Sequence, residues 1–231
     1  MSEKEFYNKL KEAMCELDGD KVDELVQEGM DAGITSLEII MEGLSPGLTI
    51  IGDEYAAKER FMVDLAMAGH IMNEAMEKLM PTADVEASIA QRKPGEYVMV
   101  MGTVQGDLHN IGKRIVSAFL SGAGIKVIDI GEDKSADEFV EAIIKYDATI
   151  VGASAIIGPV TPYCKVIHNA MVDAGLRDKV IYICGGWGMT REWCDEVGAD
   201  TFGDDHLEAL NNIKLLMAGE IPKWKDRVKA N

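Results

Sequence analysis

The loop at residues 106–113 carries the side chains best suited to chemistry. It reads Gly-Asp-Leu-His-Asn-Ile-Gly-Lys and places His109 between an apolar run at 97–103 and a helical pattern that begins at Ile111. An imidazole in such a loop can bind a metal through one ring nitrogen. The carboxylate of Asp107 can accept the proton on the other nitrogen, which fixes the tautomer and raises ligand basicity. The spacing therefore indicates a metal ligand and its hydrogen-bond partner.

Two further elements point to the same end of a predicted sheet. Ser154 follows an apolar run at 148–153, and Gly185 and Gly186 follow another at 180–184. Ligands of open parallel α/β sheets bind beyond the carboxyl ends of the strands. Taken alone, the Asp-x-His pair fits an ordinary turn with a helix N-cap, the serine a strand end, and the glycines a tight turn. Their shared location favours one binding site.

The pattern Asp107-x-His109-x-x-Gly112, followed by the serine and the glycine pair, resembles the cobalamin-binding domains of corrinoid-dependent methyltransferases. The resemblance implies that His109 replaces the cofactor's own nucleotide base as the lower cobalt ligand. It implies that Asp107 and Ser154 form a proton relay with His109, and that the displaced tail enters a channel lined by the serine and the glycines. The cofactor-binding residues that it implies are Val104, Gln105, Gly106, Asp107, Leu108, His109, Ile111, Gly112, Ser154, Ile156, Gly185 and Gly186.

Composition narrows the class of protein. A chain of 231 residues can bury a sizeable core and form one large or two small domains. Its 23 basic and 40 acidic residues give a formal charge of −17, which opposes binding to nucleic acid or to an anionic membrane. No run is long enough for a membrane span, and the polar N-terminal sequence does not read as a signal peptide. The four cysteines form no Cys-x-x-Cys pair, so a cytoplasmic protein with reduced thiols and no zinc or iron–sulfur site is expected.

Residues 1–82 are expected to form a helical cap domain of the four-helix type. The first helix is predicted over 3–17, and the second begins at an N-cap, Asp20. Residues 35–38, Thr-Ser-Leu-Glu, have the form of a capping box, and Ser45, followed by proline, offers a further N-cap.

The last long helix of this cap carries an apolar stripe. Apolar residues and one glycine recur there at steps of three and four, which predicts a buried face that methionine keeps pliable. The stripe consists of Met62, Leu65, Gly69, Met72, Met76 and Leu79.

A change of period separates the cap from the rest of the chain. Residues 83–95 are expected to be an exposed linker and residues 96–231 a cobalamin-binding α/β domain. Strands are predicted near 97–103, 125–130, 148–153, 180–184 and 199–202, alternating with helices near 111–122, 135–145, 161–174, 189–197 and 205–218. This alternation predicts a flavodoxin-like, doubly wound parallel sheet of five strands.

The resemblance extends to both halves of the chain. Corrinoid proteins of anaerobic methyltransfer systems pair a four-helix cap with a cobalamin-binding domain, and residues 51–55, Ile-Gly-Asp-Glu-Tyr, look like part of their cap. Four positions depart from the family's usual pattern: Asn110 instead of aspartate, Ile156 instead of leucine, 61–64 instead of Leu-Pro-Glu, and Trp187 instead of a smaller residue.

The function implied is that of a non-catalytic methyl carrier with cobalamin as cofactor, cycling between Co(I)-cobalamin and methylcobalamin. A substrate methyltransferase would load it from a methyl ether, as in an O-demethylase, or from a methylamine or methanol. A second methyltransferase would pass the methyl group to tetrahydrofolate or a thiol, and a reductive activating protein would serve both. The segment from Pro81 to Gly95 would act as a hinge that lets the cap leave the cofactor.

Three other functions remain open from the sequence. A cobalamin-dependent sensor or regulator shares the layout, and there His70 would be an upper ligand instead of a surface or core residue; the chain shows no basic recognition helix. A small subunit of an adenosylcobalamin mutase shares the Asp-x-His-x-x-Gly motif but not the cap. A sheet that binds flavin or nothing is the third. His168 and His206 are expected at the surface, and Trp193 and Trp224 in packing contacts.

Overall fold

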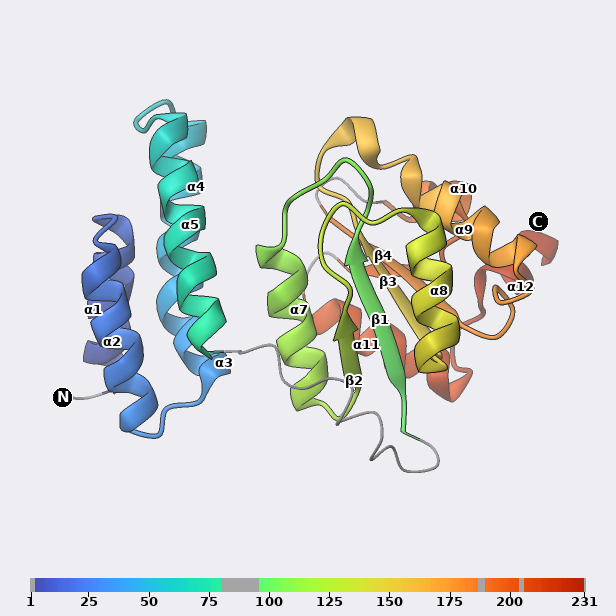
Figure 1. The fold of residues 1–231 in the computed structure, drawn as a ribbon, viewed down its shortest axis with the longest axis horizontal. Coiled ribbons are helices and arrows are strands. Elements are labelled where there is room, and N and C mark those ends of the chain that lie inside the picture. The colour runs from blue at the N-terminus through green and yellow to red at the C-terminus, as the bar shows by residue number, and fades with distance from the viewer. Residues whose placement is uncertain (1–2, 80–95, 187–189, 204–205, 231) are drawn as a thin grey trace. The chain divides into compact units, whose positions relative to one another are not determined.

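The structure, a computed structural model, describes residues 3–79, 96–186, 190–203 and 206–230 (Figure 1). The chain divides into two compact units, Met1–Asp84 and Val85–Asn231. The linker predicted at 83–95, the hinge predicted from Pro81 to Gly95 and Trp187 lie outside the described residues.

The first unit is built of helices. Their bounds are α1 Glu3–Cys15, α2 Gly19–Asp31, α3 Ser36–Glu38, a π-helix η1 Ile39–Leu44, α4 Ser45–Ala56 and α5 Met62–Leu79. The helix pairs pack through glycines: a Cβ added at Gly43 would lie 2.5 Å from Leu10 Cδ2, and one at Gly47 would lie 2.7 Å from Met14 Cβ. The expected helical cap is therefore confirmed, with α1 packed against η1 and α4.

Helix boundaries in this unit confirm one predicted cap and correct two. The Thr35–Glu38 capping box forms with both of its hydrogen bonds. The N-cap of α2 is Asp18, whose side chain accepts from the N–H of Lys21 at 3.0 Å, so the prediction of Asp20 was wrong. Ser45 is also no N-cap: it has helical backbone angles, because the π-helix carries the chain from α3 into α4 without a break.

The apolar stripe of α5 is buried over only part of its length. Met72 and Met76 are fully buried and Leu79 nearly so. At the other end Met62 is 70% exposed, and its neighbour Phe61 is 78% exposed. The prediction of a continuous buried face therefore holds for the second half of the helix and is wrong for its first turn.

The second unit is a five-stranded parallel sheet covered by helices on both faces (Figure 1). The strands are β1 Val98–Thr103, β2 Lys126–Asp129, β3 Ile150–Ser154, β4 Ile181–Gly185 and β5 Thr201–Gly203, in the order β2-β1-β3-β4-β5. The helices are α7 Ile111–Gly122, α8 Ala136–Tyr146, η2 Gly158–Val160, α9 Tyr163–Asp173, α10 Arg191–Val197, α11 His206–Ala218 and α12 Trp224–Ala230. The expected flavodoxin-like sheet is confirmed.

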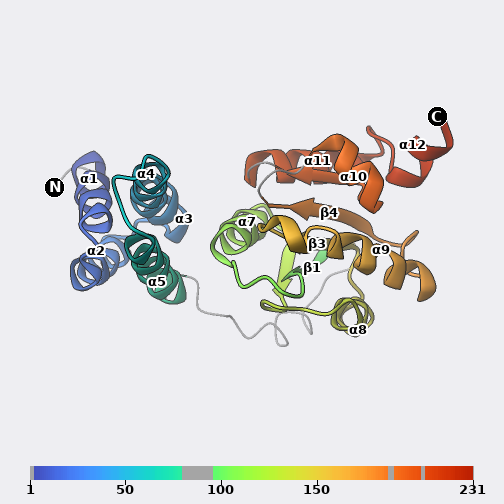
Figure 2. The same cartoon turned by 90° about the horizontal axis from the view of Figure 1, so that it is seen from above.

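Alternation along the strands divides the core between the two faces. Val98 and Val100 of β1 face α8, α9 and α10, whereas Met99 and Met101 face α7 and α11. Figure 2 shows the strands between α8 on one side and α11 on the other. Burial on both faces explains why every residue of β1 is buried and why the strand reads as a continuous apolar run.

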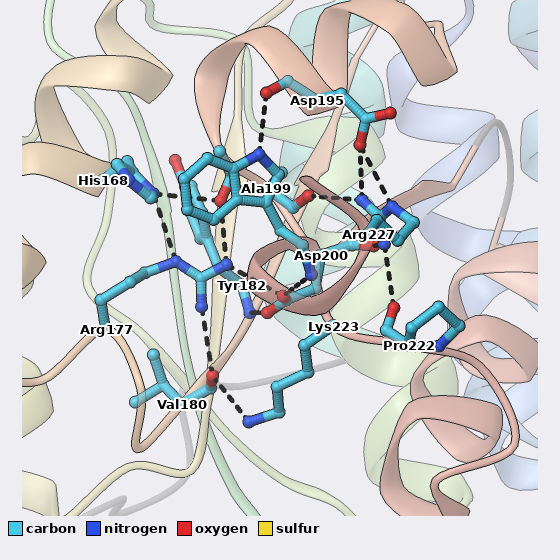
Figure 3. A network of polar contacts seen from close by, with 12 residues as sticks. His168, Arg177, Val180, Tyr182, Asp195, Ala199, Asp200, Pro222, Lys223 and Arg227 are labelled. Atoms are coloured by element: carbon cyan, nitrogen blue, oxygen red, sulfur yellow. Dashed lines mark hydrogen bonds and ion pairs between the residues drawn. The ribbon is translucent and has the colours of Figure 1, made fainter. Parts of the chain in front are cut away.

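Helix α12, which no apolar periodicity predicted, is attached through a buried polar network (Figure 3). Asp200 is fully buried, pairs with Arg177 at 3.0 Å, and accepts the N–H groups of Tyr182 at 2.8 Å and Trp224 at 2.7 Å. Arg177 also donates to the carbonyl of Gly198 at 2.8 Å. The strand β4 and helix α12 are thus joined through one carboxylate.

His168 lies inside this network, so the expectation of a surface residue was wrong. It shares the buried face of α9 with Cys164, Ile167 and Met171, and the Trp224 ring packs edge-on against it at 4.8 Å between centroids. Burial, with the positive charge of Arg177, lowers the pKa of His168 below its usual 6.5. The expectation that Trp224 packs is confirmed.

Among the described helices, none combines the length and the hydropathy that a membrane crossing requires.

Removal of the Asp200 carboxylate should destabilise the fold strongly. Asp200→Ala leaves the Arg177 guanidinium buried without its counter-charge, and we expect a loss of about 3–5 kcal/mol in the free energy of unfolding, measured by urea denaturation. Asp178→Ala is the control, because it removes an exposed carboxylate that pairs with Lys225 and should cost less than about 1 kcal/mol. Equal effects of the two substitutions would contradict the importance of the buried pair.

Candidate functional site

The loop between β1 and α7 is held on both sides by the chain around it. The N–H of Val104 donates to the carbonyl of Ser154 at 3.0 Å, which extends the contact between β1 and β3. Gly106 has a φ of +86° and donates its N–H to Asp133 at 2.7 Å. Glycine adopts this left-handed conformation without the strain that a Cβ brings, so the glycine sets the direction of the loop before His109.

Asp107 is fully buried and holds His109 in two ways. Its Oδ1 accepts the backbone N–H of His109 at 3.0 Å and lies 2.6 Å from the Nδ1 atom of the same residue. Its Oδ2 accepts the N–H of Ile156 at 2.7 Å. The His109 side chain is itself 55% exposed, so its Nε2 edge stays available to a ligand.

The hydrogen bonds keep Asp107 ionised. Burial acts to raise its pKa, but the N–H groups of Ile156 and His109 and the adjacent imidazole more than offset burial, and the pKa lies below the usual 3.8. A carboxylate at this position accepts the Nδ1 proton and directs Nε2 outward.

Ser154 ends β3 beside these residues. Its backbone pairs with Thr103 on one side and Gly185 on the other. Among the described residues no hydrogen bond joins its hydroxyl to Asp107, whose second carboxylate oxygen accepts the N–H of Ile156. The serine lines the neighbouring cavity instead.

A cavity of about 330 Å³ opens between α7, α11 and the sheet. Five predicted site residues line it: Gly112, Ser154, Ile156, Gly185 and Gly186. Sequence reasoning missed most of the remaining lining, which consists of Met99, Met101, Lys113, Ile115, Val116, Leu120, Gly152, Ala153, Ile183, Cys184, Gly203, His206, Ala209 and Ile213. The signal available for most of these residues was the apolar spacing of four strands and two helices, which does not distinguish a cavity wall from core.

The glycine pair serves two different purposes. A Cβ at Gly185 would meet nothing closer than the Gly203 carbonyl at 3.9 Å, so the absent side chain leaves room at the cavity wall. Gly186 has a φ of +139°, and a Cβ there would lie 1.9 Å from the Ala155 carbonyl oxygen. Gly186 therefore permits a close approach of the segments that follow β3 and β4.

The other predicted site residues occupy the loop without lining the cavity. Val104 is buried, Leu108 is 74% exposed, and Ile111 begins α7 in a half-buried position. Gln105 is exposed and accepts a hydrogen bond from the Tyr163 hydroxyl.

The remaining polar groups near the cavity have partners within the protein. Lys113 is buried and bonds Asp129 and the Gly131 carbonyl, which joins α7 to the segment after β2. His206 is half-buried, lines the cavity and packs edge-on against Phe119 at 4.7 Å between ring centroids. In the parts of the chain that the structure describes, no three His, Cys, Asp or Glu side chains gather in a way that could hold a metal ion.

Known proteins resemble both units of the chain. A family described as "B12 binding domain" matches residues 97–211, and a second family of that description matches residues 7–80. The trimethylamine corrinoid protein of Methanosarcina barkeri is 32% identical over 94% of this chain and 98% of its own length. Monomethylamine corrinoid protein 2 of Methanosarcina mazei is 34% identical over 90% of this chain and 96% of its own length.

A solved structure adds a similarity of fold. The monomethylamine corrinoid protein of Methanosarcina barkeri matches with a TM-score of 0.74 and 30% identity, covering 90% of this chain and 96% of that one.

The two glycines should respond differently to a methyl group. Gly186→Ala combines a left-handed backbone with an overlap with the Ala155 carbonyl, and we expect it to lower the free energy of unfolding by about 2 kcal/mol or more. Gly185→Ala should leave it unchanged or raise it by up to about 1 kcal/mol. Urea denaturation of both variants tests the contrast, which similar stabilities would refute.

Proposed function

This chain belongs to the B12-binding corrinoid proteins, and we propose that it is the methyl-carrier subunit of a cobalamin-dependent methyltransferase system. Bound cobalamin supplies a cobalt centre that can accept a methyl group and pass it on. The single observation that carries the proposal is the Asp107–His109 pair. Nδ1 of His109 lies 2.6 Å from Oδ1 of Asp107, and the imidazole is exposed near the cavity.

The donor set suits a metal that arrives inside a macrocycle. The corrin ring of cobalamin brings its own nitrogen donors to cobalt, so the protein would need to contribute only one ligand. His109 offers one imidazole whose Nδ1 is occupied by a carboxylate, the arrangement by which proteins orient metal-binding histidines. We assign the lower ligand to Nε2 of His109 on this basis.

The cavity suits the nucleotide tail that such a ligand displaces from cobalt. Two of its lining residues are near the proposed ligand. Gly112 is three positions after His109 in the sequence, and the N–H of Ile156 donates to Asp107. Gly185 and the short side chain of Ser154 leave space at the carboxyl ends of the strands. We therefore propose that the loop at 104–111 would hold the corrin and that the cavity would hold the tail.

The protein's own residues would control the proton on the ligand. Asp107 holds the Nδ1 proton and so determines how strongly Nε2 donates. We propose Ser154 as the next member of this relay, which requires its hydroxyl to turn toward the carboxylate. The serine lies on the strand next to β1, in register with Thr103.

The methyl donor is proposed from the relatives. Proteins named for trimethylamine and monomethylamine align with nearly the whole chain, which favours a methylated amine over a methyl ether or methanol. A separate substrate methyltransferase would recognise the amine, an acceptor methyltransferase would take the methyl group, and a reductive activating protein would restore the carrier. Methylation assays of the cobalamin-loaded protein with candidate methyltransferases and a panel of methylated amines, methanol and methyl ethers test this choice.

Replacement of the ligand should change the spectrum of the bound cofactor. His109→Ala removes the imidazole, so the Co(II) form should lose the nitrogen hyperfine splitting of a protein ligand in electron paramagnetic resonance. His70→Ala, on the exposed side of α5, should keep it. Unchanged splitting in the His109 variant would refute the assignment of His109 as the cobalt ligand. Loss of splitting in the His70 variant would indicate that His70 is the ligand.

Substitutions of the residues that contact the proposed ligand, or are proposed to, should shift the reduction potential of cobalt without preventing cobalamin binding. Asp107→Asn should weaken electron donation from Nε2 of His109 to cobalt, which should raise the Co(II)/Co(I) midpoint potential. Such partners typically alter metal affinity by about 10–100-fold, and a tenfold change corresponds to about 59 mV for one electron. Ser154→Ala should give a smaller shift, and redox titrations in which both variants match the wild type would exclude the relay.

A further inference from the structure

The cavity changes character along its length. At the carboxyl ends of the strands its wall includes the side chains of Ser154 and His206 and several glycines. The inner end is formed by apolar residues of β1, α7, β4 and α11, namely Met99, Met101, Val116, Leu120, Ile183, Ala209 and Ile213. Because α7 runs back along the sheet, Leu120 in its last turns lies at the level of Met99 near the start of β1.

The inner end contains no side chain that could donate a hydrogen bond, among the lining residues that the structure describes. The strands around it are paired in register, Met99 with Ile150 and Ile183 with Thr201, so their backbone groups serve the sheet. Ser117 lies nearby on α7, but its hydroxyl donates to the Met101 sulfur at 3.1 Å and the residue does not line the cavity. A polar group that entered this end would lose its water without gaining a partner.

From this lining, and resting on the function proposed above, we propose that the inner end of the cavity selects the lower base of the corrinoid. It accepts a flat aromatic base with few polar groups, as in benzimidazole and phenolic cobamides. It disfavours a purine, as in adeninyl cobamide.

The selection follows from the cost of unpaired polar groups. Adenine would bring an amino group and several ring nitrogens to a wall of methylene, methyl and thioether groups, and each buried group without a partner weakens binding. A dimethylbenzimidazole displaced from cobalt has one ring nitrogen to satisfy, and a phenolic base has only its ether oxygen. Met99 and Met101 can adapt to a flat ring and make favourable sulfur–aromatic contacts.

The test compares dissociation constants of the full chain for cobalamin and adeninyl cobamide, followed by absorbance. We expect the wild type to bind adeninyl cobamide at least about tenfold more weakly. Met99→Gln places an amide at the inner end with little change in shape and should reduce this ratio by about fivefold or more. The control is Met171→Gln, which makes the same change at a fully buried methionine on the opposite face of the sheet and should leave the ratio unchanged.

The comparison of ratios removes a property of the free cofactors. The two bases leave cobalt with different ease in solution, but this difference is common to all variants and cancels. Should Met99→Gln fail to fold, Val116→Thr adds a hydroxyl at the same wall and should narrow the ratio in the same direction.

The outcomes separate this inference from the function on which it rests. If the chain binds neither cobalamin nor cobinamide, which lacks the tail, the proposed function fails. If it binds cobalamin, but cobinamide or adeninyl cobamide binds equally well, selection by the cavity is wrong. A wild-type preference that neither Met99→Gln nor Val116→Thr reduces also overturns it.

Discussion

The buried carboxylate of Asp107 is the constraint on which the site depends. A charge without water must be surrounded by donors, and this one receives the N–H of Ile156, the N–H of His109 and the His109 ring. These partners come from two loops that follow neighbouring strands, so one charge joins the loop after β1 to the loop after β3. The imidazole and the cavity wall at Ile156 are thereby fixed relative to each other before any cofactor binds.

The arrangement of the α/β unit could be predicted because its local signals agree. Continuous apolar runs alternate with helical spacing, and parallel pairing brings the residues at the strand ends together, with Ser154 between Thr103 and Gly185 in the observed register. The Asp107–His109 contact is equally local, since it joins residues two positions apart. Such features can be predicted from the order of the residues along the chain.

Features that depend on packing escaped prediction. The N-cap of the second helix is Asp18 instead of Asp20. Ser45 continues a helix, because a π-helix precedes it in a sequence that looks like a start signal. His168 is buried because Trp224 of α12 packs against it, and α12 has no apolar repeat that would predict this contact. The start of α12 is held by Asp200, which is distant in the sequence. The apolar spacing around Met99 likewise did not reveal that this residue lines a cavity, because a cavity depends on how the elements pack.

The state of the cysteines has a consequence for a protein that carries an activated alkyl group. Thiolates are the natural targets of alkylation, and Cys184 lines the cavity itself. Burial raises the pKa of Cys184 well above its usual value, and burial also raises the pKa of Cys194 to about 12. At neutral pH both remain thiols, which are poor nucleophiles. Burial therefore makes these two side chains poor acceptors of an alkyl group.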